Sequence, residues 1–397
     1  MTTQATREET TVAIVGGGVA GLTAAMLLQR SGIDCVVLER QSRSYVEQRQ
    51  RAGVVEYRGV RMFTEWGLGG LLGTFPADNT LEVRVDGEPV FIGRDAHARE
   101  YSGVLAPQQA LVRNLIAAFL DGGGDLRFEA AAVAMTGLDS PRPVVSYTDG
   151  EGSAREIACD LIAGCDGDHG VSRESIPGSV LTAYTRDYGV TWLAVLADTP
   201  PPRYPCFGIG ARGYAAGFSR GPRTARFYLE IPAGDTQANW PPERIWAQLR
   251  QRFWLPDLVA GPITDTEIVR LRSQVFEPMS YGRLYLLGDA AHVISPMGAK
   301  GMNLALYDAE TFVNAARDYI QAGDDGGLRD YSGTCLARTW RYQEYADWMS
   351  HMFFSRSGER AAADPYGARV AKARLARFTE PSSAAAVAWG ELMTGLA

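Results

Sequence analysis

The sequence lacks the features that mark secreted, membrane-spanning and metal-binding proteins. It has five cysteines, an odd number, and no CxxC pair, which argues against a zinc site or a disulfide framework. The first ten residues are polar and contain no apolar segment of the kind found in secretory signals. No run approaches the roughly 20 apolar residues needed to cross a bilayer. We therefore expect a cytoplasmic protein with reduced thiols, no metal site and no membrane partner.

An excess of positive charge is also absent, which limits the possible partners. The formal net charge is −7, and nonspecific binding to nucleic acid needs clustered Lys and Arg. Anionic small substrates remain compatible with this charge, because local side chains bind them. The 397 residues are 46% hydrophobic, as in ordinary globular proteins. A chain of this length suffices for about two or three structural units with buried cores.

The N-terminal part has the pattern of a strand–helix–strand unit. The short β-branched segment 12–15 ends at three glycines and is typical of a buried parallel strand. Residues 20–29 have helical composition and are followed by Gly32, and residues 35–38 form a second apolar run that ends at Glu39. The unit fills about 30 residues, as expected of a βαβ motif.

The rest of the chain alternates between strand-like and helical segments. Antiparallel strands are predicted at 81–85, 144–147, 225–231 and 268–275, a helix at 110–119 and a buried strand at 284–287. The proline-rich segment 200–205 predicts a crossing between domains. A helical pattern runs from Ala299 to about Met352, and 355–365 is predicted as a loop before a short final helical region. The pattern indicates an interrupted α/β nucleotide-binding domain with a mostly antiparallel sheet inserted into it.

The segment GGGVAG, residues 16–21, fits the GxGxxG pattern between the first strand and the first helix. Gly16 permits a tight turn, Gly18 lets the backbone approach a pyrophosphate, and Gly21 lets the helix pack closely on the strand. The helix N-terminus then faces the phosphates, and Glu39 can bind a ribose hydroxyl pair. We interpret the segment as a dinucleotide-binding turn. This pattern alone does not separate FAD from NAD.

Two later motifs indicate which dinucleotide is bound. The CDG motif at 165–167 follows the apolar strand 161–163, and the GD motif at 288–289 follows the apolar run 284–287. Gly298 and Gly301 precede a predicted helix. A carboxylate at a strand end can hold a ribityl hydroxyl, and a glycine-rich helix start can hold an isoalloxazine edge with its backbone N–H groups.

These motifs, in this order and separation, resemble those of the group A flavoprotein hydroxylases. Longer strings are similar to the para-hydroxybenzoate hydroxylase family: GIDCVVLERQ, QRAGVVE, LIAGCDGDHGVSRESIP, WLAVLADTPP, EPMSYGRLYLLGDAAH and PMGAKGMNLA. The resemblance extends from about residue 11 to about residue 352. It implies FAD and NADPH as cofactors, and O₂ and a small aromatic acid as the other reactants.

The resemblance also implies an α/β fold with a Rossmann-like FAD-binding domain, an inserted, mostly antiparallel substrate-binding sheet and a helical C-terminal region. The expected boundaries are 1–78, 104–182 and 275–355 for the FAD-binding domain, the last with a long helix, 79–103 and 183–274 for the substrate-binding part, and 356–397 for the C-terminal helices. Members of the family often form homodimers, so a homodimer is a further expectation.

Carried over position by position, the resemblance implies two sets of cofactor-binding residues. FAD is expected to contact Gly16, Gly18, Gly21, Glu39, Arg51, Gln108, Asp166, Asp289, Gly301, Met302, Asn303 and Leu304. NADPH is expected to contact Arg40, Gln41, Tyr45, Asp166, His169 and Arg173. Purely structural roles stay open for some of them: Arg40 as a solvated charge, His169 as a packing residue and Asp166 as a turn cap.

A third set of residues is implied for the substrate. Arg220 and Tyr228 align with the arginine and tyrosine that bind the substrate carboxylate in the family, and an arginine fork suits a carboxylate. Pro296 aligns with the proline whose carbonyl meets the substrate hydroxyl. Arg226 aligns with an arginine that is coupled to the position of the flavin, with a surface arginine on a strand as the alternative.

The substrate-binding sheet also departs from the family pattern. Phe218 stands where the family has a serine. Phe207 and, poorly, Met393 align with two tyrosines that help to deprotonate a phenol in the family. Three explanations stay open: the substrate is already activated, for example by an amino group; a water or another tyrosine such as Tyr214 takes over; or the alignment is shifted here.

In the implied reaction, NADPH reduces FAD, the reduced flavin takes up O₂ as a C4a-hydroperoxide, and an electron-rich ring attacks the distal oxygen. We expect a hydroxy- or amino-substituted benzoate as substrate. A carboxylate-free phenol or polyketide is the alternative substrate class. A flavin oxidase and a non-catalytic flavoprotein are alternative functions, and a halogenase is disfavoured because the string WxWxIP is absent.

Overall fold

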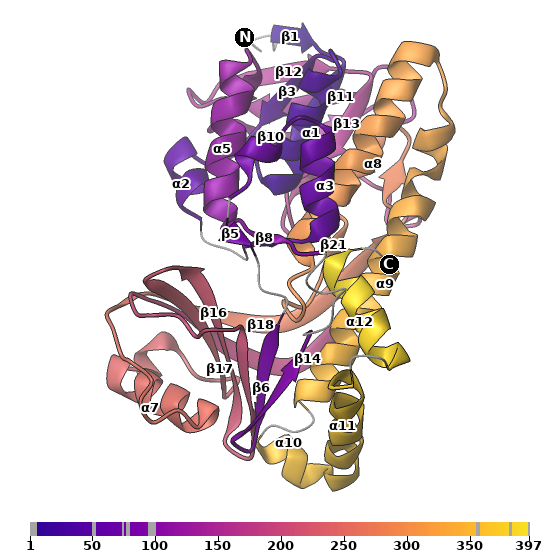
Figure 1. Ribbon diagram of the computed structural model, residues 1–397. Coiled ribbons are helices and arrows are strands. Elements are labelled where there is room, and N and C mark those ends of the chain that lie inside the picture. The colour runs from indigo at the N-terminus through magenta and orange to yellow at the C-terminus, as the bar shows by residue number, and fades with distance from the viewer. Residues whose placement is uncertain are drawn as a thin grey trace.

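The chain folds into two parts that meet at a waist, as Figure 1 shows. The computed structural model describes residues 6–49, 53–73, 75–76, 80–93, 101–354, 358–380 and 383–395. The upper part in the figure is built around a parallel sheet and the lower part around a larger, mostly antiparallel sheet. The long helix α9 (Gly326–Phe354) runs beside both parts and ties them together.

A six-stranded sheet forms the centre of the upper part, in the order β19-β20-β13-β2-β3-β9. Its strands are β2 (Val12–Val15), β3 (Cys35–Leu38), β9 (Asp125–Arg127), β13 (Leu161–Gly164), β19 (Ser280–Tyr281) and β20 (Leu284–Leu286). All neighbours pair in parallel except β19 and β20. The inner strands β2, β3, β13 and β20 are apolar runs, and they form one core with α1 (Val19–Arg30), α5 (Gln108–Asp121) and α8 (Gly301–Ala322).

Two smaller sheets complete the upper part. The first has the order β1-β12-β11-β10, with β1 (Thr6–Glu9), β10 (Ala131–Thr136), β11 (Val144–Thr148) and β12 (Ala154–Ala158). The second has the order β4-β8-β5, with β4 (Val54–Val55), β5 (Phe75–Pro76) and β8 (Val104–Leu105). Short helical elements are α2 (Arg43–Gln48), α3 (Tyr57–Glu65), η1 (Gly69–Leu71), α6 (Val171–Glu174) and η3 (Gly288–Ala290).

An eight-stranded sheet forms the lower part, in the order β21-β18-β14-β17-β16-β15-β6-β7. Its strands are β6 (Leu81–Val85), β7 (Glu88–Ile92), β14 (Thr182–Ala197), β15 (Cys206–Gly210), β16 (Gly213–Gly221), β17 (Thr224–Ile231), β18 (Ile263–Glu277) and β21 (His292–Val293). One face packs on α7 (Pro242–Phe253), and the other packs on the second half of α9. A short η2 (Gln237–Asn239) precedes α7.

The prediction of a domain crossing at residues 200–205 is wrong. This segment joins β14 to β15, and both strands belong to the eight-stranded sheet. Proline removes a backbone donor wherever it occurs, so it stops a strand within a domain as effectively as it marks a border. The proline content therefore reports a strand end and not a change of domain.

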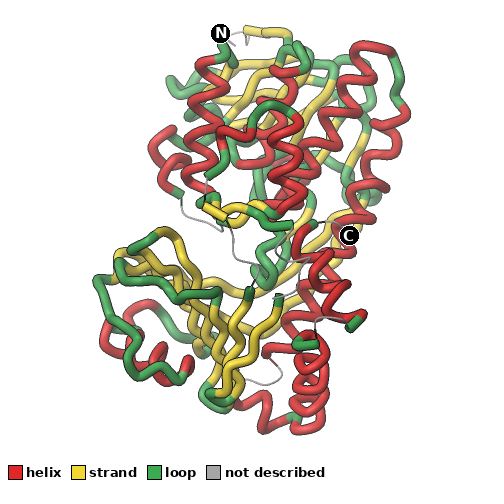
Figure 2. The backbone as a smooth tube through the Cα atoms, in the orientation of Figure 1, coloured by secondary structure: helices red, strands yellow, loops and turns green. Residues whose placement is uncertain are grey.

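The C-terminal region is helical, as predicted, and the helical pattern from Ala299 to about Met352 corresponds to two helices, α8 and α9. Helix α8 ends at Gly323, whose φ of 73° lies in the left-handed region, and α9 begins at Gly326. The segment 355–365 was predicted as a loop, yet it contains α10 (Gly358–Ala363). Helices α11 (Pro365–Phe378) and α12 (Ala384–Thr394) follow, and Figure 2 shows them beside the lower sheet.

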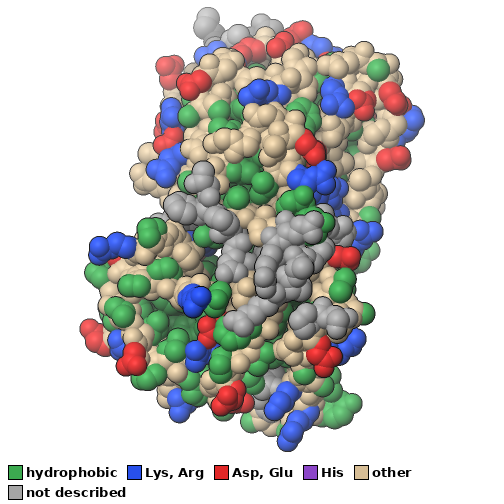
Figure 3. All heavy atoms as spheres, viewed as in Figure 1, with side chains coloured by type: hydrophobic (Ala, Val, Ile, Leu, Met, Phe, Trp, Pro, Cys, Tyr) green, Lys and Arg blue, Asp and Glu red, His purple; other side chains and the backbone are tan. Residues whose placement is uncertain are grey.

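The α/β fold class with an inserted, mostly antiparallel sheet and a helical C-terminal region is confirmed. All five cysteines are free. Among the described residues, none of the helices combines the length and apolar character needed to cross a membrane. Figure 3 shows Lys and Arg side chains interspersed with Asp and Glu on the face in view, so no basic patch gathers there.

Candidate active site

The glycine turn between β2 and α1 has the geometry that its sequence pattern predicts. Gly16 has a φ of 109°, and a Cβ added there would lie 2.3 Å from the carbonyl oxygen of Cys165. A Cβ on Gly21 would lie 2.0 Å from the carbonyl oxygen of Gly16, so only glycine lets α1 pack on β2. A Cβ on Gly18 would meet nothing within 4 Å, because Gly18 faces an open cavity.

Glu39, at the end of β3, holds this turn together. Its carboxylate accepts hydrogen bonds from the backbone N–H of Gly17 and of Gln41, each at 2.8 Å. The side chain is buried yet lines the cavity. Because a carboxylate offers about four acceptor positions, it retains acceptor capacity for hydroxyl groups of a ligand.

A cavity of about 1130 Å³ runs from the glycine turn to the eight-stranded sheet. From the upper part it is lined by the predicted residues Gly16, Gly18, Glu39, Arg40, Gln41, Tyr45, Gln108, Asp166, His169, Asp289, Gly301, Met302 and Asn303. From the sheet and the loop before α8 it is lined by Arg220, Arg226, Tyr228 and Pro296. The volume exceeds that of a site for one small molecule, since ordinary ligand pockets span about 300–1,000 Å³.

Four predicted residues are not part of this lining. Gly21 lies one helical turn behind it, where it packs on the backbone of Gly16. Leu304 is fully buried in the core of the upper part. Arg173 does not line the cavity, and Arg51 lies outside the described residues.

Arg173 joins two loops instead of lining the cavity. Its guanidinium donates to the carbonyl oxygens of Asp168 at 2.5 Å and Ala290 at 3.1 Å, and it lies over the ring of Phe276 at 3.9 Å. His169, four residues earlier, has 81% of its side chain exposed and lines the cavity. The two residues that the resemblance assigned to one ligand therefore point to different surroundings.

Asp166 is a partly buried turn cap that also borders the cavity. Its Oδ2 accepts from the backbone N–H of Ser172 at 2.9 Å, whereas its Oδ1 is buried without a partner among the described residues. Burial raises the pKa of Asp166, and the hydrogen bonds from Ser172 oppose this. A buried acceptor without a donor is costly, so Asp166 is suited to accept one from a ligand.

The Gly-Asp motif near residue 289 is fixed from behind by a buried pair that the sequence reading missed. Asp308 on α8 accepts from the backbone N–H of Gly288 at 3.0 Å and lies 2.7 Å from Nε2 of His292. Both side chains are buried. Asp289 itself is exposed to the cavity. The spacing of Asp308 from the motif carried no signal that could have identified it.

The start of α8 is anchored by a second buried network that was also missed. The ammonium of Lys300 lies 2.5 Å from a carboxylate oxygen of Glu56 and donates to the carbonyl oxygen of Leu392. Tyr307 and Tyr342 donate to the other oxygen of Glu56 at 2.7 and 2.9 Å. Both Glu56 and Lys300 line the cavity, so an ion pair borders the site at the beginning of α8.

The side-chain amide of Asn303 forms hydrogen bonds with the backbone near Glu56 and Lys300. It accepts from the N–H of Glu56 at 3.0 Å and donates to the carbonyl oxygens of Val54 at 3.1 Å and Ala299 at 3.2 Å. Asn303 therefore positions β4 against α8, while Gly301 and Met302 present the helix start to the cavity.

Two arginines reach the cavity from the eight-stranded sheet and differ in their partners. Arg226 is buried and pairs with Glu267 at 3.4 Å and Asp265 at 3.9 Å, so it is not a surface arginine. Arg220 forms no ion pair with any carboxylate among the described residues, and its side chain contacts Tyr228. Burial lowers the pKa of Arg220. A partly buried cation that pairs with none of the described carboxylates favours an anionic ligand.

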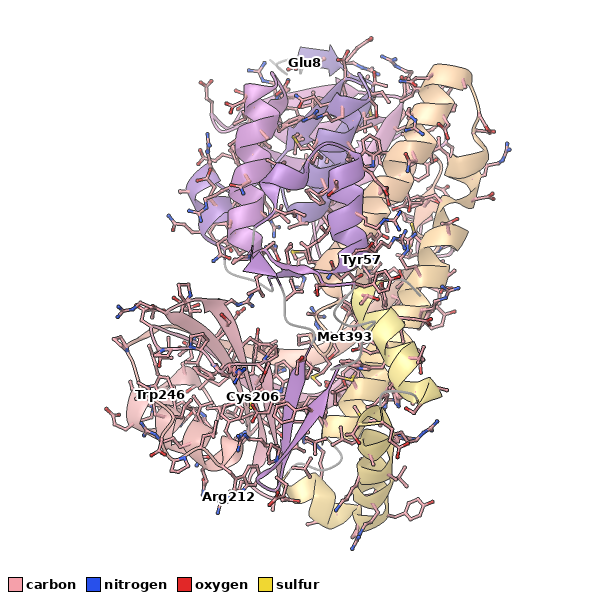
Figure 4. All side chains as sticks on the ribbon, in the orientation of Figure 1. Glu8, Tyr57, Cys206, Arg212, Trp246 and Met393 are labelled. Carbon is pink, nitrogen blue, oxygen red and sulfur yellow. The ribbon has the colours of Figure 1, made fainter. Side chains whose placement is uncertain are left out.

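The wall next to these arginines is aromatic and rich in methionine. Phe207 packs edge-on to Phe218 at 5.6 Å between ring centroids and stacks on Phe353 at 5.2 Å. Met393, from α12, also lines the cavity, and Figure 4 shows it where the two parts meet. Phe207 and Met393, which align with the family's two tyrosines, therefore bring no hydroxyl to this wall.

Comparison with known proteins identifies the family to which this chain belongs. The family model described as an FAD binding domain matches residues 9–346. A p-hydroxybenzoate hydroxylase from Acinetobacter baylyi is 33% identical over 349 residues, which cover 87% of this chain and 86% of that protein. The chain belongs to the FAD-dependent aromatic hydroxylases.

More distant hydroxylases extend over the same length. A 3-amino-4-hydroxybenzoate 2-monooxygenase from Streptomyces cremeus is 26% identical, over 83% of this chain and 84% of that protein. The crystal structure of a p-nitrophenol 4-monooxygenase from Pseudomonas putida DLL-E4 superimposes with a TM-score of 0.82 at 18% identity and covers 98% of both chains. This FAD-dependent hydroxylase therefore has the complete fold seen in that enzyme.

Proposed function

We propose that this flavoprotein hydroxylates the ring of a small aromatic acid that carries a hydroxyl or amino group, with NADPH as the reductant. The observation that carries the proposal is Arg220, a cavity cation that lacks a carboxylate partner among the described residues and stands beside an aromatic wall. The relatives from Acinetobacter and Streptomyces carry the names of hydroxybenzoate and aminohydroxybenzoate monooxygenases, which agrees with an acid of this kind.

The upper end of the cavity fits FAD. Gly18 leaves open space where a pyrophosphate would approach the backbone, and the N-terminus of α1 faces that space. Glu39 retains acceptor capacity for a ribose, and Asp289 is exposed to the same cavity for a ribityl hydroxyl. When bound, FAD supplies the reduction and activation of O₂ that no protein side chain can perform.

The chain's own residues would orient the ring and exclude water. Arg220 and Tyr228 would hold the carboxylate by charge-assisted hydrogen bonds. The carbonyl of Pro296 would meet the ring substituent, and the surrounding phenylalanines and methionines would keep the reacting region apolar. Arg226 would not compete with Arg220 for the carboxylate, since Glu267 and Asp265 already bind its guanidinium.

The proposal of NADPH rests on the surface next to Glu39. Arg40 is exposed and lines the cavity with Gln41, Tyr45 and His169. A guanidinium directly after the ribose-binding carboxylate suits a 2′-phosphate. Arg40→Ala is expected to lower kcat/KM for NADPH and leave that for NADH unchanged, which steady-state kinetics with both nucleotides would measure.

The Arg220 assignment is tested by titrating the flavin absorbance of the holoenzyme with 4-hydroxybenzoate and 4-aminobenzoate. In Arg220→Ala, loss of a buried contact between charges should weaken binding by about 2–5 kcal/mol. Arg223→Ala is the matched control, because Arg223 is exposed on the turn before β17. An unchanged Kd in Arg220→Ala would contradict the proposal and favour a phenol or polyketide without a carboxylate.

A flavin oxidase is separated from a hydroxylase by the product. A hydroxylase should couple most NADPH oxidation to an oxygenated ring when the aromatic acid is present. Hydrogen peroxide as the only product with every acid tested would contradict hydroxylation and favour an oxidase.

A further inference from the structure

Two buried tyrosines in the cavity direct their hydroxyl groups to thioethers. Tyr345 donates to Sδ of Met393 at 2.7 Å, and Tyr214 donates to Sδ of Met297 at 3.7 Å. Both tyrosines are fully buried and both line the cavity. A thioether is a weak acceptor, so each hydroxyl would form a stronger hydrogen bond with an oxygen in the same place.

Tyr345 belongs to a face of α9 that forms the apolar wall. Tyr345, Met349 and Phe353 are spaced by four residues and therefore lie on one side of the helix. All three are buried, and Phe353 stacks on Phe207 of β15. The helix thus carries the Tyr345 hydroxyl to the wall that Phe207 forms on the sheet side.

Tyr345 also contacts the loop that leads into α8. A Cβ added to Gly298 would lie 2.4 Å from its ring carbon Cε1. Gly298 follows Pro296 by two residues and precedes the helix start at Gly301. The Tyr345 ring is therefore fixed beside the loop that separates the aromatic wall from the proposed flavin edge.

The sheet register places Arg220 at a distance from Phe207, which lies at the far end of this wall. Phe207 is paired with Ala216, and Arg220 lies four residues farther along β16. Four residues of a strand span about 13 Å, which the long arginine side chain partly bridges. A ring whose carboxylate meets Arg220 would direct its opposite substituent toward the wall that contains Tyr345.

Tyr345 and Tyr214 differ in how readily their hydroxyl groups can change hydrogen-bond partner. The ring of Tyr214 is stacked on Trp192 at 5.4 Å and 7° and meets Phe354 edge-on at 5.1 Å, so its hydroxyl is held within the aromatic stack. The hydroxyl of Tyr345 donates to the thioether of Met393, and the flexible side chain of Met393 can move aside. Burial and the charge of Glu56 raise the pKa of Tyr345, which keeps it a neutral donor, and a hydrogen bond with Trp389 opposes them.

We propose that the Tyr345 hydroxyl recognises the substrate's ring hydroxyl by donating a hydrogen bond to its oxygen in exchange for the Met393 thioether. This inference rests on the proposed function and deepens it, because it names the substituent. An aniline nitrogen is a poor acceptor, since its lone pair is shared with the ring. Tyr345 therefore selects a hydroxybenzoate over an aminobenzoate and over benzoate.

The test compares Kd values of the holoenzyme for 4-hydroxybenzoate and benzoate by flavin absorbance titration. Tyr345→Phe removes only the hydroxyl and should weaken binding of 4-hydroxybenzoate roughly five- to tenfold, while benzoate is unaffected. Tyr214→Phe is the matched control and should change both Kd values equally. An unchanged ratio of the two Kd values in Tyr345→Phe would overturn the assignment.

A second variant separates the hydroxyl from the sulfur. Met393→Leu keeps the volume and removes the thioether, so the preference for 4-hydroxybenzoate should persist. Loss of the preference in Met393→Leu, to the extent expected for Tyr345→Phe, would overturn the proposal, because it would assign selectivity to the sulfur.

The ultraviolet spectrum of bound 4-hydroxybenzoate reports the pKa of its phenol group. A purely structural role of Tyr345 would leave that pKa unchanged. Donation from Tyr345 stabilises the phenolate, so the pKa of bound 4-hydroxybenzoate should be higher in Tyr345→Phe than in the wild type. An unchanged pKa would overturn the inference. If the wild type binds 4-hydroxybenzoate and benzoate with equal Kd, this inference fails, while the assignment of the carboxylate to Arg220 stands. If the wild type binds no aromatic acid, the proposed function fails as well.

Discussion

The glycines of the N-terminal turn are required for different physical reasons. Gly21 is needed by the fold, because a methyl group there would meet the backbone oxygen of Gly16. Gly18 has an extended backbone that any residue can adopt, and a methyl group there would enter open space. Only a ligand that fills this space makes glycine necessary at position 18.

Gly18→Ala and Gly21→Ala should therefore separate FAD binding from folding. The apoprotein of Gly18→Ala should keep its unfolding free energy within about 0.5 kcal/mol and lose FAD affinity, since the methyl group occupies the ligand's space. Gly21→Ala should lose roughly 1–3 kcal/mol or more of apoprotein stability by overpacking. Urea unfolding and FAD fluorescence titration measure both, and normal FAD affinity in Gly18→Ala would contradict the proposed pyrophosphate site.

The buried pair of His292 and Asp308 predicts a pH dependence of stability. Burial alone would lower the pKa of His292, but the charge of Asp308 and the hydrogen bond between them outweigh it and raise the pKa. The folded-state pKa thus lies above the unfolded value of about 6.5. The stability contributed by this pair is complete below that value and is lost as the pH rises through the folded-state pKa.

Asp308→Asn should remove this contribution. The Tm of the wild type should fall as the pH rises from about 6.5, and this part of the fall should be absent in Asp308→Asn. His169→Gln is the control, because His169 is exposed and should leave the profile unchanged. Parallel Tm profiles of Asp308→Asn and the wild type in differential scanning calorimetry would show that the pair does not titrate as described.

At the scale of elements, a buried cation helps to attach α12 to the active site. Lys300, just before α8, donates to the carbonyl oxygens of Leu392 and Met393 while it pairs with Glu56. Carbonyls at a helix C-terminus lack partners within the helix, so the ammonium satisfies them. The last described helix is thereby linked to the segment that borders the proposed flavin edge.

Lys300→Met should loosen α12 and destabilise the protein. Removing one partner of a buried ion pair typically costs about 3–5 kcal/mol, because Glu56 would be left buried and charged. Hydrogen exchange should accelerate more in the α12 amides than in those of the core helix α1. Lys372→Met is the matched control, since Lys372 is the other lysine of the chain and is exposed on α11. Unchanged exchange in α12 would show that Lys300 does not hold the helix.

Elements were predictable where local sequence decides them. The segments 12–15 and 35–38 are short apolar runs bounded by glycine and polar residues, and β2 and β3 have these bounds. The prolines at 200–205 were misassigned because a strand end inside a sheet and a domain border share the same local chemistry. The break between α8 and α9 lies in the segment GDDGG, residues 323–327, whose glycines and aspartates are a helix-end signal within the longer helical pattern.

At the scale of the whole molecule, the candidate site is assembled from residues far apart in the chain. The motifs around Gly16, Asp166 and Asp289 were predictable, because each is set by a strand end and the glycines next to it. Lys300 and Glu56 are separated by 244 positions and Tyr345 and Met393 by 48, and neither pair has a sequence pattern. Arg173 shows the converse, since it lies within a motif but joins two loops and does not line the cavity.

The site requires both parts of the molecule. The glycine turn, Glu39 and Asp289 belong to the upper part, whereas Arg220 and the aromatic wall belong to the lower part. Helix α9 runs beside both and carries Tyr345, which lines the shared cavity. One cavity can therefore place a dinucleotide from one part next to an aromatic acid from the other.

The central claim is that FAD lies in this cavity, between the turn at Gly16 and the strand end at Asp289. Its most direct test is the FAD content of the purified protein, measured by absorbance after release of the cofactor and again after incubation with added FAD. We predict a yellow protein that holds about one FAD per chain. A colourless protein that takes up no added FAD would contradict the claim.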